Sequence, residues 1–250
     1  FVLVFGPKKA KKLLWTTFEF ALWKIYPKAN CSGESICWEQ IRYNFSSPSI
    51  IDVGANVGKL SYFFLDLFPG AQVYSIEPIK EFFEKIDDSR LSKFNLALSN
   101  KKRTLTLYQS GSGSKPFPKK TKGKKTGTFI VHAITGDDFV KEFNINKVDI
   151  IKIDVDGLDF EVLQGFQKVI KNDKPCIQFE LSRWWIKIGY TLKQAHKFFD
   201  DLDYELFHMS DYGFKELNYE LPDCLFITIN IFAKPKEVKL KNFNKYLCDE

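Results

Sequence analysis

An apolar run followed by a glycine-rich turn is the part of this chain best suited to binding a nucleoside. Residues 49–59 read Ser-Ile-Ile-Asp-Val-Gly-Ala-Asn-Val-Gly-Lys, which is typical of a buried strand, a tight turn and the start of a helix. Gly54 and Gly58 allow a ligand to approach the backbone closely, and Asn56 tolerates a left-handed backbone. Glu77 ends the next apolar run, at the spacing of a carboxylate that accepts hydrogen bonds from both ribose hydroxyls. The alternative is an ordinary strand-to-helix turn with a solvated glutamate.

Asp52 narrows the choice of nucleoside. A carboxylate at the end of this strand would repel the pyrophosphate of NAD at close range. S-adenosylmethionine instead carries an ammonium and a sulfonium group and no phosphate, so a negative floor and nearby aromatic faces would suit it. The chain contains no Gly-Lys-Ser/Thr motif for ATP phosphates. The turn therefore favours S-adenosylmethionine.

A second group of acids lies in residues 149–157, which read Asp-Ile-Ile-Lys-Ile-Asp-Val-Asp-Gly. Lys152 and Asp154 are two residues apart in an apolar strand, so their side chains face the same side. A lysine there needs a charged partner or an exit into a cleft. Asp154 ends this strand and Glu180 ends the next, so we expect them to face one another across the cleft. We predict that Asp154 is a general base or orients the acceptor, with Lys152 and Glu180 beside it.

Alternative roles stay open for several of these acids. Asp156 could cap the following helix, and Glu180 could pair with Arg183. Asp154, Asp156 and Glu180 together would offer hard oxygen ligands to magnesium or calcium. The spacing permits such a site without requiring it, and we do not expect a metal.

Three further features have a structural and a functional interpretation. His132 is a second candidate base, although a structural role is favoured. Trp184, Trp185 and Tyr190 either form a platform for a sugar or belong to the core, and the core is favoured. Six lysines and no acid lie in the Gly/Ser/Lys/Pro-rich stretch 110–126, which we expect to be a loop. It could be a lid over the acceptor, a binding site for an anionic partner such as a nucleotide sugar, nucleic acid or membrane surface, or a solvated mobile loop.

The remaining pattern is of apolar strands alternating with helices, which predicts an α/β fold with a parallel sheet covered on both faces. Ligands of such sheets bind outside the carboxyl ends of the strands. The expected strands are 50–53, 72–76, 95–98, 103–108, 128–134, 148–154, 175–181, 204–208 and 225–231. The expected helices are 59–68, 81–86, 137–143, 158–170 and 191–202, preceded by a mainly helical segment over 8–45.

Net charge, cysteine spacing and apolar run lengths indicate which partners and which cell compartment to expect. The formal net charge is +6, and the stretch 115–125 accounts for nearly all of it, so a general nucleic-acid surface is not expected. Five cysteines without a Cys-x-x-Cys pair indicate reduced thiols and an intracellular, cytoplasmic protein, although a Cys31–Cys37 bridge is possible. No apolar run is long enough to span a membrane. The chain begins at Phe1, so a preceding anchor or domain stays open, and the oligomeric state is unreadable.

Several motifs, in order, resemble those of the FkbM-like methyltransferases. They are Ile-Asp-Val-Gly-Ala-Asn-Val-Gly (51–58), Ile-Glu-Pro (76–78), Asn-Leu-Ala-Leu-Ser (95–99), Gly-Ser-Gly-Ser (111–114), Asp-Asp (137–138) and Ile-Lys-Ile-Asp-Val-Asp-Gly-Leu-Asp-Phe-Glu-Val-Leu-Gln-Gly (151–165). The resemblance covers roughly residues 49–182 and is most specific at 151–165. The family more often has Glu at the position of Asp156, and Leu is usual near Thr135.

The resemblance implies a Rossmann-like class I methyltransferase: a doubly wound, mostly parallel sheet of seven strands with helices on both faces. It would occupy residues 49–233, between an N-terminal helical cap (1–48) and a charged C-terminal tail (234–250). It also implies methyl transfer from S-adenosylmethionine to a hydroxyl. Acceptors in the family are often sugars or sugar-bearing metabolites, so we expect a hydroxyl of a sugar or glycan. The residues implied at the donor site are Asp52, Gly54, Asn56 and Gly58 at the methionine end, Glu77 at the ribose, and Ala97, Leu98 and Ser99 near the adenine. The alternatives are a nucleic-acid methyltransferase that uses the basic 115–125 loop, and a non-catalytic relative that binds without turnover.

Overall fold

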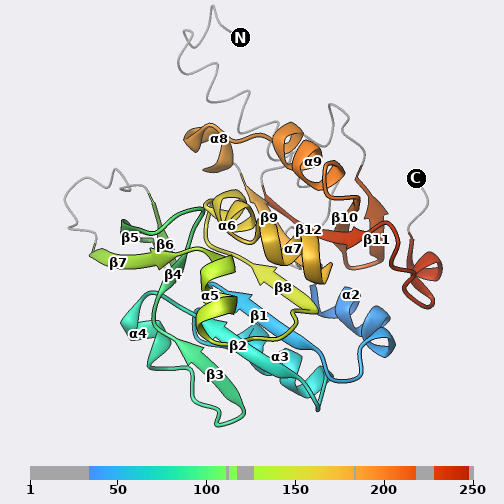
Figure 1. Cartoon of the computed structure of the whole chain (residues 1–250), viewed down its shortest axis with the longest axis horizontal. Helices are drawn as coiled ribbons and strands as arrows, with labels where there is room; N and C mark the ends of the chain where they lie inside the picture. The colour runs from blue at the N-terminus through green and yellow to red at the C-terminus, as the bar shows by residue number, and fades with distance from the viewer. Residues whose placement is uncertain (1–33, 111–112, 117–126, 183, 218–227, 248–250) are drawn as a thin grey trace, which may run out of the picture. The chain divides into compact units, whose positions relative to one another are not determined.

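The computed structural model describes residues 34–110, 113–116, 127–182, 184–217 and 228–247 (Figure 1). Gly33–Glu250 form one compact unit. This unit therefore begins before residue 49, where the methyltransferase domain was expected to start. The expected helical segment over 8–33 and Cys31 lie outside the described residues.

The described part of this unit is built on an eight-stranded sheet in the order β11-β10-β12-β9-β8-β1-β2-β3 (Figure 1). Strands β9, β8, β1, β2 and β3 are parallel, and β12, β10 and β11 add in antiparallel pairings. The bounds are β1 Ser49–Val53, β2 Gln72–Ile76, β3 Leu91–Phe94, β8 Ile150–Ile153, β9 Cys176–Ser182, β10 Tyr204–Ser210, β11 Gly213–Glu216 and β12 Thr228–Pro235. The Rossmann-like, doubly wound fold is confirmed. The sheet has eight strands rather than seven, and β3 and β11 were not expected.

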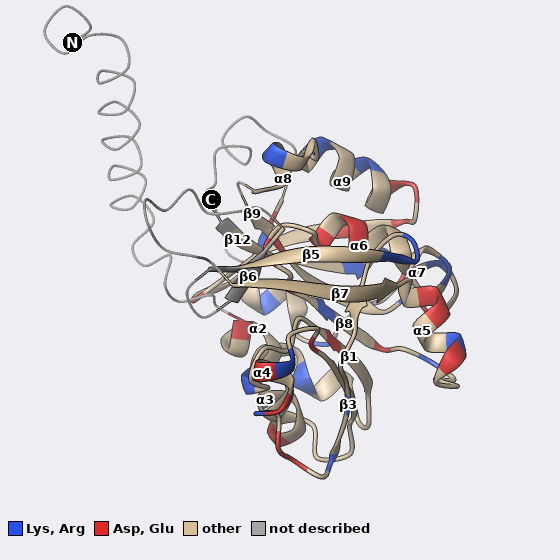
Figure 2. Ribbon diagram, turned by 90° about the vertical axis from the view of Figure 1, so that its left-hand side faces the viewer, with Lys and Arg blue, Asp and Glu red and all other residues tan. Residues whose placement is uncertain are grey.

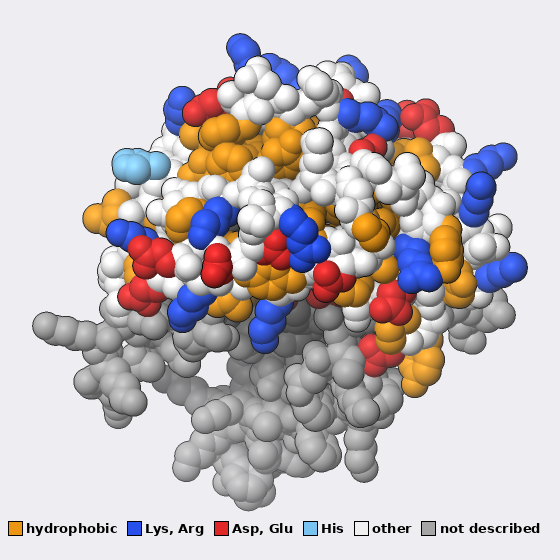
Figure 3. Space-filling view, turned by 90° about the horizontal axis from the view of Figure 1, so that it is seen from below, with side chains coloured by type: hydrophobic (Ala, Val, Ile, Leu, Met, Phe, Trp, Pro, Cys, Tyr) orange, Lys and Arg blue, Asp and Glu red, His pale blue; other side chains and the backbone are white. Residues whose placement is uncertain are grey.

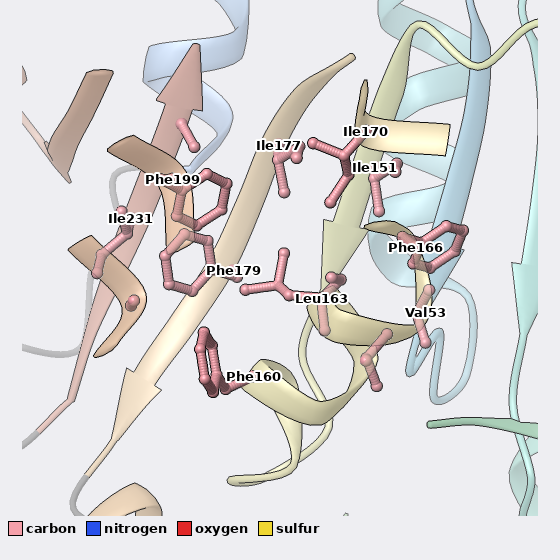
Figure 4. Close-up of a cluster of buried hydrophobic side chains, with 14 of the residues drawn as sticks. Val53, Ile151, Phe160, Leu163, Phe166, Ile170, Ile177, Phe179, Phe199 and Ile231 are labelled. Atoms are coloured by element: carbon pink, nitrogen blue, oxygen red, sulfur yellow. The ribbon is translucent and has the colours of Figure 1, made fainter. Parts of the chain in front are cut away.

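Helices cover both faces of this sheet. Alternate residues of β1 point to opposite sides: Ile51 and Val53 pack with helices α5, α6, α7 and α9, whereas Ile50 packs with α2 and α3. Figure 4 shows the first of these clusters, with Phe166 near Val53 and Phe179 near Phe199. The bounds are α2 Glu34–Ile41, α3 Lys59–Leu67, α5 Gly136–Glu142, α6 Asp159–Gly165, α7 Gln167–Asp173 and α9 Leu192–Asp200, with shorter helices α4 Lys80–Phe83, α8 Trp184–Ile188, η1 Arg42–Asn44 and η3 Phe243–Tyr246.

A second, four-stranded sheet has the order β4-β7-β5-β6. Its strands are β4 Ala97–Leu98, β5 Arg103–Ser110, β6 Gly113–Lys115 and β7 Thr128–Ile134, and they carry few charged residues (Figure 2). One face buries Leu107 and Val131, whereas Ile130 on the other is 74% exposed. The expected strands 95–98, 103–108 and 128–134 therefore build a separate sheet. The expected loop over 110–126 begins as a hairpin, because Lys115 pairs with Tyr108, and 117–126 lie outside the described residues.

Two expected elements differ from the structure. The expected helix over 158–170 is divided into α6 and α7 at Phe166, because the carboxylate of Asp137 accepts hydrogen bonds from the amides of Lys168 and Val169 and starts a new helix there. The tail from residue 234 was expected to lack a pattern. Instead Phe243 is 4% exposed and packs on Phe214 with ring centroids 4.7 Å apart.

Surface charges of both signs are mixed. Figure 3 shows lysines and arginines interspersed with acidic and apolar side chains over the face seen from below. That face carries no continuous basic surface among the described residues. Within the same residues, every helix is too short or too polar to cross a lipid bilayer.

Candidate functional site

A cavity of about 350 Å³ opens where the parallel strands of the main sheet end. Its floor is the turn after β1, with Gly54 and Asn56, and Glu77 follows β2 beside it. Leu105 and Leu107 of β5 form an apolar wall, so the second sheet closes one side. The other lining residues are Val53, Ile76, Pro78, Phe82, Leu96, Ala97, Leu98, Asp154, Val155, Asp156, Leu158 and Glu180. The sequence pattern predicted a ligand site at this place, outside the carboxyl ends of the strands.

Three residues of this turn have a left-handed backbone, which glycine and asparagine adopt more easily than other residues. Gly54, Asn56 and Gly58 have φ angles of +79°, +52° and +84°, in the left-handed region. A Cβ atom on Gly54 would lie 1.9 Å from the carbonyl oxygen of Asp154, so this position requires glycine. Gly58 does not line the cavity but stands at the N-cap of α3. The turn thus brings its backbone against β8.

Glu77 is fixed in place by the turn. Its Oε2 accepts a hydrogen bond from the amide of Asn56 at 2.9 Å, and its Oε1 accepts one from the amide of Ile79 at 2.8 Å. Only 5% of the residue is exposed, and this burial raises the pKa of Glu77 to about 7 against the opposing effect of the two amides. A carboxylate can accept about four hydrogen bonds, so the two made here leave capacity for hydroxyls in the cavity.

Asp52 does not line the cavity, contrary to expectation. The residue is fully buried, its Oδ1 lies 3.0 Å from Nζ of Lys152, and its Oδ2 accepts a 2.6 Å hydrogen bond from Ser61. Its charge is therefore compensated, and its predicted repulsion of a pyrophosphate is removed. The negative charge that lines the cavity comes instead from Glu77, Asp154, Asp156 and Glu180, because every charged residue among the described cavity-lining residues is acidic.

Lys152 also lies beneath the cavity rather than in it. The residue is 4% exposed, and its Nζ donates to the carbonyl of Gly54 at 3.2 Å and lies 3.9 Å from Oδ2 of Asp154. Burial opposes the charge of this ammonium, but the carboxylates of Asp52 and Asp154 more than offset that effect and raise the pKa of Lys152. It stays protonated and holds the backbone of the turn.

Asp154, Asp156 and Glu180 all line the cavity. The side chain of Asp154 is 46% exposed, so it is accessible from the cavity. Asp156 has a φ angle of +54°, and the N-cap position of α6 is occupied by Leu158 rather than by Asp156. Arg183, the alternative partner of Glu180, lies outside the described residues. No group of three or more His, Cys, Asp or Glu side chains in the described parts of the chain is arranged to hold a metal ion.

Asp159 is a site residue that the sequence analysis missed. It is fully buried, and its carboxylate accepts hydrogen bonds from the amides of Val155 and Gly157 at 3.2 and 3.0 Å. Burial, with a smaller contribution from Asp154, raises the pKa of Asp159 to about 7. The side chain therefore fixes the loop that carries Asp154 and Asp156. An aspartate two residues after the glycine of a tight turn was the signal for it.

Ser99 does not approach the cavity, although Ala97 and Leu98 do. It is 1% exposed, and its Oγ donates to Glu161 at 3.1 Å and accepts from Arg103 at 2.9 Å. Arg103 also forms an ion pair with Glu161. This network joins β5 to α6 and supports the wall of the cavity. Glu161 is 62 residues from Ser99 in the sequence, so no local pattern indicated the network.

The other candidates lie away from the cavity. His132 is exposed on β7, on the opposite face from Val131. Trp185 is fully buried and stacks on Phe179 at 6.0 Å, and Tyr190 packs on Phe160 at 5.1 Å. The core interpretation of Trp185 is therefore confirmed. Cys37 is buried, with its Sγ 3.5 Å from the carbonyl oxygens of Ser210 and Gly213, and its bridge to Cys31 stays a prediction.

A Rossmann-like sheet with a glycine-containing turn after β1, an acid after β2 and acids after β8 defines the architecture of a class I methyltransferase. The sequence profile of the Methyltransferase FkbM domain matches residues 52–215. The chain belongs to this family, and the resemblance drawn from its motifs is confirmed.

Individual relatives are distant. The chain is 25% identical to the methyltransferase sdnD of Sordaria araneosa, over 48% of this chain and 61% of that protein. It is 27% identical to the 2-O-methyltransferase NoeI of Sinorhizobium fredii, over 49% of this chain and 59% of that protein. A crystal structure of methyltransferase FkbM from Methylobacillus flagellatus KT is 16% identical, with a TM-score of 0.48, and covers 75% of this chain and 44% of that one. The chain thus spans about three-fifths of the length of each curated relative.

Proposed function

We propose that the chain is an S-adenosylmethionine-dependent O-methyltransferase that acts on a hydroxyl group of a sugar or glycan. The observation that carries the proposal is the cavity itself. It joins a carboxylate held at the end of β2, Glu77, to an accessible carboxylate at the end of β8, Asp154. Membership of the FkbM family and the similarity to NoeI, a 2-O-methyltransferase, support the reaction class.

The charge and shape of the cavity fit the proposed methyl donor. Its described lining contains four carboxylates and no lysine, arginine or histidine, which favours a cationic ligand over a nucleotide pyrophosphate. Glu77 would accept hydrogen bonds from the ribose hydroxyls, and Ala97 and Leu98 would contact the adenine. Gly54 and Asn56 would lie along the methionine part. When bound, S-adenosylmethionine supplies an electrophilic methyl group on a positively charged sulfur.

Asp154 is the proposed general base. An acceptor hydroxyl oxygen would form a bond to the methyl carbon while the carbon–sulfur bond breaks, and the electron pair of the broken bond would stay on sulfur. The hydroxyl proton passes to the carboxylate of Asp154, a step that typically contributes about 10²- to 10⁴-fold. Glu180 lies in the same cavity and would accept a hydrogen bond from a neighbouring acceptor hydroxyl. The apolar wall of Leu105 and Leu107 would contact C–H groups of the acceptor and exclude water.

The test is methyl transfer to a panel of glycans, with RNA and DNA offered as competing acceptors. The protein is incubated with S-adenosylmethionine carrying a labelled methyl group, and products are examined by mass spectrometry for the gain of one labelled methyl in place of hydrogen. An O-methylated sugar product supports the proposal. Label in RNA or DNA would show that the acceptor is a nucleic acid rather than a glycan. Binding of the donor with no transfer to any acceptor would favour a non-catalytic relative that binds without turnover.

A further inference from the structure

Four polar side chains form a row across the main sheet, on the face covered by α2 and α3. The strand register places Ser75 beside Asp52, Asp52 beside Lys152, and Lys152 beside Gln178. None of the four is more than 4% exposed. The residues that precede them on the same face of the sheet are apolar and belong to the core, so each buried polar group needs a hydrogen-bond partner close by.

Both ends of the row are held by helices. On one side, Ser75 Oγ donates to Ser61 Oγ of α3 at 2.8 Å, and Ser61 Oγ donates to Asp52 at 2.6 Å. On the other side, the side-chain oxygen of Gln178 accepts a 2.6 Å hydrogen bond from the indole N–H of Trp38 in α2. The side-chain nitrogen of Gln178 donates to Glu34, also at 2.6 Å. The row is therefore fixed at both ends.

Lys152 is the member of this row that reaches the cavity floor. Its ammonium donates to the carbonyl of Gly54 and lies 3.9 Å from the carboxylate of Asp154. Gly54 begins the turn whose Asn56 amide donates to Glu77. A displacement of the ammonium would therefore act on the turn, on Glu77 and on the position of Asp154, although Lys152 itself does not line the cavity.

We propose that Lys152 is a positioning residue, which the in-register row and helix α2 hold in place so that it fixes the turn under the methyl donor. An effect of Lys152 on binding of the methyl donor rests on the proposed function, whereas its effect on the order of the turn does not. A purely structural ion pair between Lys152 and Asp52 would stabilise the fold without controlling the turn.

Three variants separate these possibilities. Lys152→Met removes the donor to Gly54 but leaves Asp52 charged and buried. The double variant Asp52→Asn/Lys152→Met removes both charges, so it avoids an uncompensated buried carboxylate and is used if the single variant does not fold. Lys234→Met is the matched control, because Lys234 is a 7% exposed lysine that pairs with Glu205 at 2.6 Å and donates to the carbonyls of Pro235 and Val238, which do not line the cavity.

The first readout needs no ligand. Hydrogen–deuterium exchange by mass spectrometry is measured on the peptide covering 53–60 in each folded variant. We expect faster exchange in this peptide for Lys152→Met and for the double variant, and wild-type exchange for Lys234→Met. Wild-type exchange in the turn of a folded variant that lacks Lys152 would overturn the inference, whether or not the protein binds S-adenosylmethionine.

The second readout is calorimetric titration with S-adenosylmethionine. Loss of a charge-assisted hydrogen bond that orders the turn should raise the Kd about ten- to a hundredfold in the double variant, with no change in Lys234→Met. Equal affinities in wild type and the double variant would remove Lys152 from donor binding. If the wild type itself does not bind, the proposed function fails, and the exchange measurement alone decides the role of Lys152.

Discussion

The ammonium nitrogen of Lys152 lies 3.0 Å from the Oδ1 atom of Asp52, with the two side chains 5% and 0% exposed. They come from neighbouring parallel strands and face one another in register. A buried ion pair of this kind adds little net stability, but removal of one partner leaves a charge without compensation. The pair therefore behaves as one unit beneath the cavity.

Asp52→Asn should lower the free energy of unfolding by roughly 3–5 kcal/mol, because Lys152 would lose the partner that compensates its charge. The double variant Asp52→Asn/Lys152→Met should be less destabilised than this single variant. Denaturant unfolding of the wild type, Asp52→Asn, Lys152→Met and the double variant measures the three losses. A double variant whose loss equals the sum of the two single losses would show that the side chains are not coupled.

Trp38→Ala should destabilise the protein by about 3–5 kcal/mol, although Trp38 precedes the residues matched by the family profile. The ring is fully buried, lies 5.4 Å from Phe64 and 5.6 Å from Phe232, and donates to Gln178. Tyr43→Ala is the control, because Tyr43 is 72% exposed. Equal unfolding midpoints for the two variants would mean that α2 contributes nothing to the core.

The stability of the protein should fall as the pH rises from about 4 to 7. Burial raises the pKa of Glu77 and Asp159 to about 7, from ordinary values of 4.5 and 3.8. Between these values the unfolded chain loses the two protons while the folded protein keeps them, so the unfolded state gains the advantage. Well above pH 7 both groups are ionised in the folded protein as well, so they no longer change the free energy of unfolding with pH.

Thermal unfolding at pH 5 and pH 7.5 measures this effect. We expect a lower melting temperature at pH 7.5, and a smaller difference in the double variant Glu77→Gln/Asp159→Asn, which cannot titrate at either position. The same decrease in wild type and the double variant would assign the titration to other groups.

Asp154→Asn should leave donor affinity within about twofold of wild type and lower turnover about 10²- to 10⁴-fold, because an amide cannot accept the hydroxyl proton. Initial rates with a glycan acceptor and a calorimetric titration with S-adenosylmethionine measure the two effects separately. Asp66→Asn, an exposed aspartate on α3, is the control. Wild-type turnover in Asp154→Asn would exclude Asp154 as the base.

Local patterns in the sequence predicted most of the fold. The alternation of apolar strands and helices, with glycines after the first strand, was enough to predict the doubly wound sheet and to place its cavity at the strand ends. Glu77, Asp154 and Glu180 were predicted from their positions at strand ends, and all three line the cavity. The division of the strands between two sheets was not predictable, because 95–98 and 128–134 read as strands of either sheet.

The roles of Asp52 and Lys152 required information that local patterns do not contain. Both were recognised as unusual residues in apolar strands, but their pairing depends on β1 lying beside β8 in one particular register. The packing of Phe243 on Phe214 could not be predicted for the same reason. Phe243 lies in a charged segment of the sequence with no apolar periodicity. The burial and pairing of these residues depend on contacts between segments that are distant in the sequence.

Calorimetric titration of the wild type, Glu77→Gln and Glu81→Gln with S-adenosylmethionine tests the proposed binding of the methyl donor through the carboxylate of Glu77. The titration is done at pH 8, where Glu77 is mostly ionised, and Glu81 is the control because it is an exposed acid on the adjacent helix. We predict saturable binding to the wild type and to Glu81→Gln, and a Kd about ten- to a hundredfold higher for Glu77→Gln, since hydrogen bonds to a charged acceptor are lost. No binding to the wild type, or equal affinities in all three proteins, would show that Glu77 does not hold S-adenosylmethionine in this cavity.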